Sequence, residues 1–245
     1  MGFNRRLLNI QVVDSNTIPV TFSATSTYVT DWHDTIQGVA YNAVDGYLYT
    51  LERSDSNLDC YLIRRNPTTG AYISVIGHIG QDKYGLTFDT NGYFWAITRQ
   101  ASSVIRKYNT SLTYQNVQFN VTGYYANDVA SDLNNIFYVT REGSSTTYSY
   151  NTSGTSQGNF SLGTTLDQNI FHANGRLWKG GNTNASTWYG RTIATSTNEG
   201  NFSNNNPYGG NFMGYASWDS NNELLWSSEF ISGTGYVIRK YTPNY

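Results

Sequence analysis

Apolar and polar side chains alternate over short stretches of this chain, and turns rich in Asp, Asn and Gly separate the stretches. Alternation with a period of two is typical of β-strands that bury one face. One pair of such stretches recurs five times within the 245 residues, and each copy carries an aromatic residue in its second stretch. The copies are GVAYNAVDGYLYTLER (38–53), GLTFDTNGYFWAITR (85–99), DVASDLNNIFYVTR (128–141), NIFHANGRLWKGGN (169–182) and GYASWDSNNELLWSSEF (214–230).

The copies begin 41 to 47 residues apart. A repeat of this length with several short strands per copy is the signature of a β-propeller blade. The first copy and the residues after it divide into four strands at 38–42, 47–52, 60–65 and 72–76. The sequence therefore predicts an all-β, five-bladed β-propeller made of four-stranded antiparallel blades.

The fifth copy stops after its third strand, at Tyr245. A segment near the other end of the chain, 18–23, resembles the outer strands of the other copies. We therefore expect the N-terminal strand to complete the last blade and close the ring, which removes open strand edges. The expected single domain, 1–245, has blades at 38–77, 85–121, 128–162, 169–204 and 214–245, the last together with 18–26.

The aromatic residue of each second strand predicts packing between blades, because large planar side chains fill the gap between twisted sheets. These residues are Tyr49, Trp95, Phe137, Trp178 and Trp226. The corner between the first two strands of each copy, such as Asp45-Gly46, predicts a two-residue hairpin with positive φ at both central positions.

Charged residues gather where the first strand of a copy begins and the second strand ends, which is one end of an antiparallel blade. The acids at this end are Asp34, Asp82, Asp128 and Asp167, and the bases are Arg53, Arg99 and Arg141. One interpretation is that each guanidinium pairs with a carboxylate of its own or the next blade. The alternative is a polar pocket for an anionic or sugar ligand at one mouth of the central channel.

Two connections depart from the repeat by being longer, 28–34 and 204–211. In a closed ring both lie on the same face, next to the fifth blade. They carry aromatic and amide side chains of the kind found in recognition loops. The candidate partner-binding residues here are Trp32, His33, Asp34, Tyr208 and Asn211. Simple capping of the ring is the alternative.

Charge and cysteine content exclude several classes of protein. The net charge is −2 and only 13% of the residues are charged, so no basic surface predicts a nucleic-acid partner. The one cysteine, Cys60, lies in an alternating stretch and is expected to be a packed strand residue. We expect no secretory signal at the N-terminus, and no apolar run approaches the roughly 18 residues that span a bilayer.

Motifs for catalysis or for cofactor binding are missing from the sequence. The three histidines are dispersed, and only His33, between Asp31 and Asp34, has acidic neighbours. No phosphate loop, dinucleotide fingerprint or Gly-x-Ser-x-Gly elbow occurs. We therefore expect no metal, no cofactor and no enzymatic activity.

The repeated unit Gly-x-x-[Phe/Tyr]-[Asp/Asn]-x-x-Gly-x-[Leu/Phe]-[Tyr/Trp] resembles the generic blade of many propeller families over residues 18–245. The low charge and the abundance of Asn, Thr, Tyr and Gly resemble accessory proteins of bacteriophage virions, in heads, tails or fibres. This resemblance implies a non-catalytic structural or attachment module on the virion, without membrane insertion. Its partner would be a protein of a larger assembly or a host-surface glycan.

Two other functions stay open at this point. The first is a lectin-like carbohydrate-binding propeller, secreted or extracellular by a non-classical route. The second is a glycoside hydrolase, because five-bladed propellers include families that cut arabinan and xylan. Such an enzyme needs two carboxylic residues across the channel mouth, which would come from the four aspartates Asp34, Asp82, Asp128 and Asp167.

Overall fold

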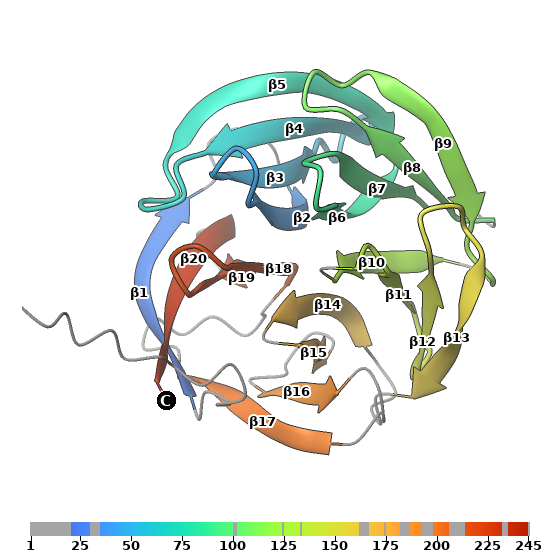
Figure 1. The fold of residues 1–245 in the computed structure, drawn as a ribbon. Helices are drawn as coiled ribbons and strands as arrows, with labels where there is room; N and C mark the ends of the chain where they lie inside the picture. Colours follow the sequence, from blue (N-terminus) through green and yellow to red (C-terminus); the bar gives the residue numbers. More distant parts are fainter. Residues whose placement is uncertain are drawn as a thin grey trace, which may run out of the picture.

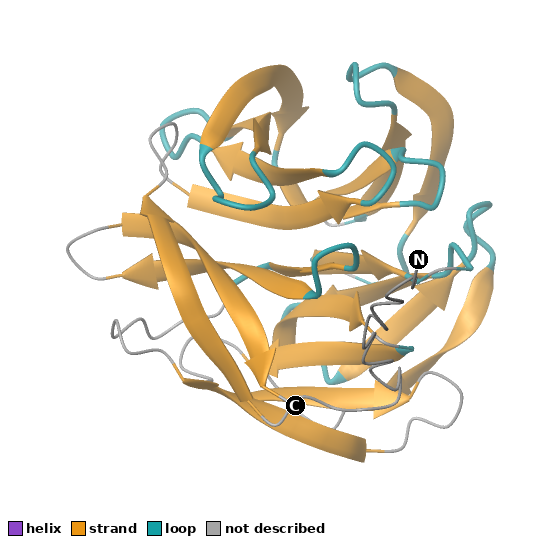
Figure 2. Ribbon diagram, turned by 60° about the vertical axis from the view of Figure 1, so that its left-hand side comes forward, coloured by secondary structure: helices purple, strands orange, loops and turns teal. Residues whose placement is uncertain are grey.

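The structure is a computed structural model that describes residues 21–29, 35–99, 102–123, 125–132, 134–161, 167–173, 175–181, 187–192, 198–205, 214–231 and 235–244. Within these ranges every regular element is a β-strand and no helix occurs. The strands form antiparallel sheets arranged side by side around a common centre (Figure 1). Seen from the side, corners and connections lie at both ends of the ring (Figure 2). The expected all-β, propeller-like architecture is confirmed.

Three of the sheets have four strands each and follow the chain from the centre outward. Unit 1 contains β2 (Thr35–Asn42), β3 (Tyr47–Arg53), β4 (Asp59–Arg65) and β5 (Tyr72–Gln81). Unit 2 contains β6 (Lys83–Phe88), β7 (Phe94–Thr98), β8 (Val104–Tyr108) and β9 (Tyr114–Asn120). Unit 3 contains β10 (Ala126–Ser131), β11 (Phe137–Arg141), β12 (Thr146–Tyr150) and β13 (Ser156–Ser161).

The fourth sheet has eight strands, in the order β14-β15-β16-β17-β1-β20-β19-β18. Its first half, unit 4, contains β14 (Asp167–Ala173), β15 (Arg176–Gly181), β16 (Thr187–Thr192) and β17 (Asn198–Asn205). Its second half, unit 5, contains β18 (Ala216–Asp219), β19 (Leu224–Ile231), β20 (Gly235–Asn244) and β1 (Thr21–Val29).

The N-terminal strand pairs with the last strand of the chain, as expected. β1 runs antiparallel to β20 over its whole length, from Thr21 opposite Asn244 to Val29 opposite Val237. At its beginning β1 also pairs in parallel with β17. This second pairing joins units 4 and 5, so the described strands form four hydrogen-bonded sheets and not the five separate ones that the repeat predicted.

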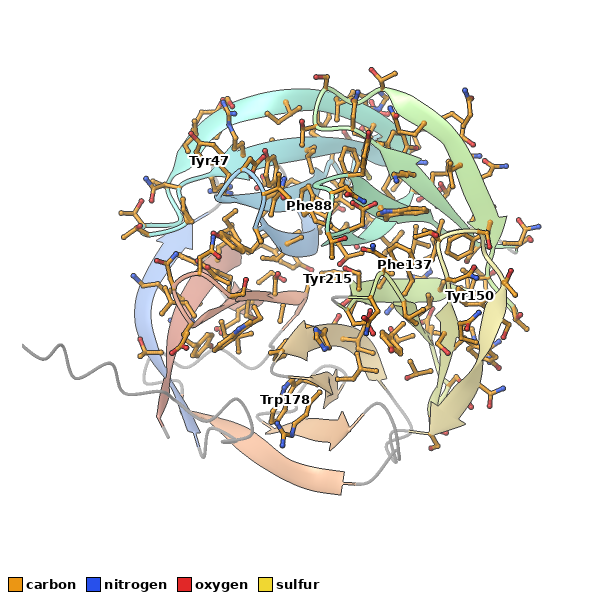
Figure 3. The ribbon with its side chains drawn as sticks, in the orientation of Figure 1. Tyr47, Phe88, Phe137, Tyr150, Trp178 and Tyr215 are labelled. Carbon is orange, nitrogen blue, oxygen red and sulfur yellow. The ribbon has the colours of Figure 1, made fainter. Side chains whose placement is uncertain are left out.

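Apolar clusters lie between successive units and hold the ring together. One cluster joins units 1 and 2, and others join units 2 and 3, 3 and 4, 4 and 5, and 5 and 1. The five repeated aromatic residues are all buried, which confirms their expected packing role. Tyr49 contacts Phe88 of the next unit at 5.0 Å between ring centroids, and Trp95 contacts Phe137 of the next unit at 4.5 Å. Figure 3 shows such rings in the gaps between sheets.

The corners between the first two strands are longer than the expected two-residue hairpin in units 1, 2, 3 and 5, whereas in unit 4 Ala173 pairs with Arg176 and two residues lie between them, as expected. In the corners of units 1, 2 and 5, which the structure describes throughout, only one residue has positive φ, for example Gly92 with φ 79°. The corner of unit 2 is longer than two residues, because the Asp89 and Tyr93 main chains pair around it. The Asp89 carboxylate accepts hydrogen bonds from the main-chain N–H groups of Asn91 and Tyr93. A turn of this length needs only its last residue in the left-handed region.

Cys60 lies in β4 and is buried, as expected for a packed strand residue. Within the described ranges we find no helix whose length and hydropathy would let it span a bilayer.

Candidate functional site

The inner strands of the ring begin at one end of the molecule, which we call the mouth. Near its start, each of the inner strands β2, β6, β10 and β14 has a register shift in its pairing with the next strand. A β-bulge bends the strand and redirects side chains locally. The alternation of side chains between the two faces of each sheet is therefore interrupted where these strands meet the mouth.

Two arginines and two tyrosines from neighbouring units lie in contact at the mouth. We call them the arginine–tyrosine row: Arg53, Tyr84, Arg99 and Tyr125. The guanidinium carbons of Arg53 and Arg99 lie 5.5 and 4.8 Å from the centroid of the Tyr84 ring. The guanidinium of Arg99 is also 5.3 Å from the Tyr125 ring. Cation–π contacts at these distances are attractive, so the row links units 1, 2 and 3.

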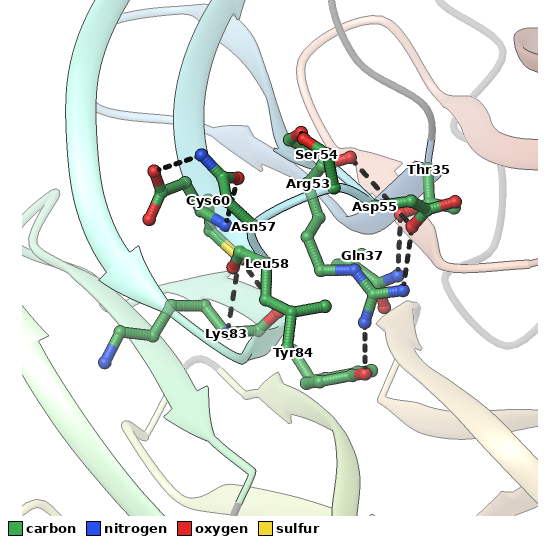
Figure 4. A network of polar contacts seen from close by, with 12 residues as sticks. Thr35, Gln37, Arg53, Ser54, Asp55, Asn57, Leu58, Cys60, Lys83 and Tyr84 are labelled. Atoms are coloured by element: carbon green, nitrogen blue, oxygen red, sulfur yellow. Dashed lines mark hydrogen bonds and ion pairs between the residues drawn. The ribbon is translucent and has the colours of Figure 1, made fainter.

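Each arginine of the row is paired with a carboxylate. Arg53 lies 3.1 Å from Asp55 in its own unit and also donates to the Tyr84 hydroxyl (Figure 4). Burial alone would lower the pKa of Arg53, but Tyr84 and Asp55 outweigh this and raise it. Arg99 forms an ion pair with Glu142 of the next unit. The row is therefore compensated in charge.

Arg141 fixes the connection between units 2 and 3 in place. Its Nη1 donates to the carbonyl oxygen of Thr122 at 3.2 Å, and its Nη2 donates to the hydroxyl of Tyr148 at 2.7 Å. Gly123, which follows Thr122, has φ 87°. A Cβ at Gly123 would lie 1.6 Å from Nη1 of Arg141, so only glycine allows this contact. The same connection carries Tyr125.

Buried polar groups near the centre of the ring are joined by hydrogen bonds. The hydroxyl of Tyr215 donates to Oε1 of Gln37 at 3.2 Å, and Nε2 of Gln37 donates to Oγ1 of Thr35 at 3.1 Å. Tyr215 lies near the centre of the ring (Figure 3). Burial and the nearby Asp128 raise the pKa of Tyr215 well above its usual range.

Asp128 bridges the inner strands of units 3 and 4. Its side chain is 2% exposed. Oδ1 accepts the main-chain N–H of Val129 at 2.8 Å, and Oδ2 accepts that of Ile170 at 2.9 Å. Burial raises the pKa of this carboxyl well above its usual range, and the two hydrogen bonds offset part of the rise. Asp128 therefore joins two sheets from inside and does not face solvent.

A small cavity lies between the inner strands β6, β10, β14 and β18. Its polar lining comes from Thr87, Ser131, His172 and Ser217. Its volume admits about two water molecules. Thr87, Ser131 and His172 stand near the ends of their strands, so the cavity lies away from the mouth. Burial lowers the pKa of His172. Among the described residues, no group of three or more His, Cys, Asp and Glu side chains is placed to hold a metal ion.

The candidate residues of the two long connections, Trp32, His33, Asp34, Tyr208 and Asn211, lie outside the described residues. The three candidate arginines do lie at the mouth, and the row brings Arg53 close to Arg99. The expected aspartates are not their partners where the structure describes them. The main-chain carbonyl of Asp82 accepts the N–H of Arg99, and Asp128 is buried below. The side chain of Asp167 is not among the described ones.

The residues of the mouth that the repeat does not indicate are Tyr84, Tyr125, Tyr215 and Glu142. None stands at a position that all copies share, so alignment of the copies passes over them. In the sequence, these residues are marked only by their departure from the repeated pattern. Tyr84, Tyr125 and Tyr215 all stand near the start of an inner strand, but at different positions relative to the repeated segment, so alignment of the copies does not bring them together.

No protein-family model matches this chain, and no curated protein matches it. Solved structures are similar in fold. A glutaminyl cyclase from Myxococcus xanthus has a TM-score of 0.70 at 11% identity, over 93% of this chain and 99% of that one. A luciferin-regenerating enzyme has a TM-score of 0.57 at 8% identity, over 90% and 97% of the two chains.

A protein of unknown function from Bacteroides caccae has a TM-score of 0.55 at 12% identity, over 78% of this chain and 69% of that one. Identities this low carry information about the fold and none about activity. Together with the ring of four-stranded units, these likenesses identify the chain as a β-propeller.

Proposed function

We propose that this chain is a non-catalytic attachment module that presents its mouth to a partner. The observation that carries the proposal is the arginine–tyrosine row, a charge-compensated set of recognition groups at the mouth. Tyrosine gives a large contact area at a low cost in conformational entropy, and both tyrosine and arginine are enriched at protein interfaces. Tyr125 of the row is 50% exposed, so contacts with a partner would form on the surface of the mouth.

We further propose that the ring has five blades, which are units 1 to 5 of a single domain over residues 1–245. In this interpretation the eight-stranded sheet is two blades joined by the short parallel pairing of β17 with β1. Two observations support it. The order of strands divides into two series of four, and an apolar cluster between units 5 and 1 matches those between the other units.

The proposed place of the protein is the virion, where it would bind a protein of a larger assembly or a host-surface glycan. This rests on the resemblance in composition, with few charges and many Asn, Thr, Tyr and Gly residues. The net charge of −2 disfavours a nucleic acid as the partner.

A glycoside hydrolase is a weaker proposal. It would need two carboxyl groups that reach a bound sugar from opposite sides. Asp128, one of the four candidate acids, is buried, and both of its oxygens accept main-chain N–H groups. The solved enzymes of similar fold are a glutaminyl cyclase and a luciferin-regenerating enzyme, at 11% and 8% identity. Neither likeness assigns a reaction to this chain.

The test of attachment blocks one face of the ring at a time. Ser56 is exposed in the connection between β3 and β4 at the mouth, and Ser111 is exposed at the opposite end, between β8 and β9. The variants Ser56→Cys and Ser111→Cys would each be coupled to a large maleimide polymer. Burial raises the pKa of the native thiol, Cys60, to about 11, so it does not compete.

Binding of the coupled variants to virus particles and to cell envelopes of the host would then be measured. Polymer at residue 56 is expected to abolish binding, and polymer at residue 111 is expected to leave it intact. Loss of binding only with the polymer at residue 111 would overturn the choice of face. Absence of binding by the unmodified chain would overturn the proposed function.

A further inference from the structure

We propose that Tyr125, Arg99 and Glu142 form a binding site for a neutral sugar ring. The inference rests on the proposed function, because it names the chemical class of the partner that the mouth receives. Three separate observations carry it: the backbone of Tyr125, the support beneath it, and the balance of charges around it.

The backbone of Tyr125 is held in a conformation that bulky residues avoid. Its φ is 53°, in the left-handed region, where a non-glycine residue costs free energy. Burial does not offset this cost, because the side chain is 50% exposed. Strain of this kind persists where the surroundings enforce it, and it concentrates at ligand sites. A structural role alone would be served better by glycine at this position.

The segment that carries Tyr125 is fixed on both sides by unit 3. The main-chain N–H of Glu142 donates to the carbonyl oxygen of Tyr125 at 3.1 Å. Three residues earlier, Arg141 holds the carbonyl oxygen of Thr122. Arg99 packs its guanidinium against the Tyr125 ring. The ring is therefore preorganised, so a ligand would lose little affinity to ordering of the protein.

Donors and acceptors stand side by side next to this ring. Arg99 is paired with Glu142, whose side chain is 48% exposed and whose carboxylate can accept further hydrogen bonds. An anionic ligand would be repelled by Glu142, and a cationic ligand would compete with Arg99 for the same carboxylate. A sugar avoids both costs, because its hydroxyls accept from Arg99 and donate to Glu142. Its C–H face can pack on the tyrosine ring.

The site is open to solvent, because Tyr125 and Glu142 are both about half exposed, so a single sugar would bind weakly. We expect a dissociation constant of about 1 mM for one ring. Detection therefore needs a multivalent display, in which several copies of the chain or of the glycan act together.

The experiment measures binding of the intact chain to an array of neutral and acidic oligosaccharides. The decisive variant is Tyr125→Gly, because glycine adopts positive φ without strain. We expect at least a tenfold loss of binding to neutral glycans, with a Tm equal to or above that of the wild type. Tyr125→Phe keeps the ring and should retain most of the binding.

The matched control is Tyr114→Ala, which removes an exposed tyrosine from the outer strand β9 and should leave glycan binding unchanged. Glu142→Ala should reduce binding, since it removes the acceptor. Unchanged binding in Tyr125→Gly would overturn the inference, as would binding to acidic glycans alone. Absence of any glycan signal while the mouth still attaches to particles or envelopes would overturn this site and leave the proposed function standing.

Discussion

The guanidinium of Arg65 lies 2.6 Å from the carboxylate of Glu52, and both side chains are buried inside unit 1. Arg65 also donates to the hydroxyl of Thr50 and to the carbonyl oxygen of Gly70. The ion pair is thus part of a hydrogen-bond network that satisfies most of the donors of the guanidinium. It links β3 to β4 and to the corner that follows β4.

Unit 5 contains a second pair of the same kind. Nε of Arg239 lies 2.7 Å from Oε2 of Glu229, again with both side chains buried, and the hydroxyl of Tyr241 also donates to Glu229. Glu52 and Glu229 each stand three residues after the repeated aromatic residue of their unit. The two glutamates therefore occupy equivalent positions in their units, although the two arginines stand at different register positions of the third strand.

Removal of one partner of the pair in unit 1 should destabilise the ring strongly. Glu52→Ala leaves a buried guanidinium without its counter-charge, which typically costs about 3–5 kcal/mol. Replacement of both partners, Glu52→Leu with Arg65→Met, should cost much less, because no charge is left buried. Urea unfolding of the three proteins measures this difference. Equal destabilisation of the single and double variants would show that shape and not charge is what the pair supplies.

Lys83 should make stability depend on pH in the alkaline range. Its amine is buried and donates to Oγ1 of Thr98, which stands where Glu52 stands in unit 1. Burial, and to a lesser extent Arg106, lower the pKa from 10.5 to about 8. Between these two values the unfolded chain binds the proton and the folded chain does not. Stability from this group therefore rises as the pH increases through that interval.

Lys83→Met removes this dependence. The variant should be more stable than the wild type below pH 8, by up to about 3 kcal/mol at 1.36 kcal/mol per pKa unit. The gap should close as the pH approaches 10.5. Denaturant unfolding of both proteins across this range is the measurement. A gap that does not change with pH would contradict the lowered pKa. Both proteins contain the same tyrosines, so the contributions of tyrosine titration to stability cancel in the comparison.

Asp128→Asn should destabilise the ring even though it removes a buried titratable group. Two main-chain N–H groups, of Val129 and Ile170, point at the two carboxyl oxygens. An amide offers one acceptor and turns its own N–H₂ toward the other donor. A buried donor left without an acceptor costs about 1–3 kcal/mol.

The size of this effect should shrink as the pH rises. The pKa of Asp128 is raised above its unfolded value of 3.8, so the folded chain keeps a proton that the unfolded chain loses. The contribution of Asp128 to stability therefore falls as the pH increases above 3.8. The Asp128→Asn variant has no such slope, so the gap between the two proteins should be widest in mild acid. Denaturant unfolding at several pH values measures it, and a gap that widens toward neutral pH would contradict this assignment.

The repeat predicted the strands and their order, because alternation and turn residues are local signals that each copy carries by itself. It also predicted the pairing of the N-terminal strand with β20, since the fifth copy lacks an outer strand. It did not predict the parallel pairing of β17 with β1. This pairing involves Thr21, Phe22 and Ser23 with Ser203, Asn204 and Asn205, and polar segments so far apart in the sequence carry no pattern that specifies their register.

The site was harder to predict than the fold for a related reason. Arg53 and Arg99 were found because they recur at the ends of second strands. Their carboxylate partners, Asp55 and Glu142, lie in connections whose course depends on packing against the next unit. The left-handed backbone of Tyr125 has no sequence signature, because it is a residue type that avoids this conformation.

Cys60 should be inert in the folded protein and reactive in the unfolded one. Its side chain is buried, and burial raises the pKa of the thiol to about 11, so the thiolate is scarce at neutral pH. Reaction with a thiol reagent should then proceed only as fast as the ring opens. Glu52→Ala is expected to speed up labelling in proportion to its loss of stability. Rapid labelling of the wild type would show that unit 1 opens locally.

The closing role of β1 can be tested by moving the chain ends. In a circular permutant, the chain begins at residue 32 and Tyr245 is joined directly to Met1. Residues 1–20 then connect β20 to β1. β1 and β20 are antiparallel, with Thr21 opposite Asn244, so this connection joins the ends that already lie together. The permutant should fold with the same circular dichroism and a Tm within a few degrees of the wild type.

Deletion of residues 1–29 should behave in the opposite way. It removes β1, exposes the edge of β20 and breaks the link that β1 makes between β17 and β20. An open β edge of this length invites association between chains. We expect a broad unfolding transition and concentration-dependent aggregation in light scattering. A truncated chain that stays monomeric and unfolds as sharply as the wild type would show that β1 covers the ring without closing it.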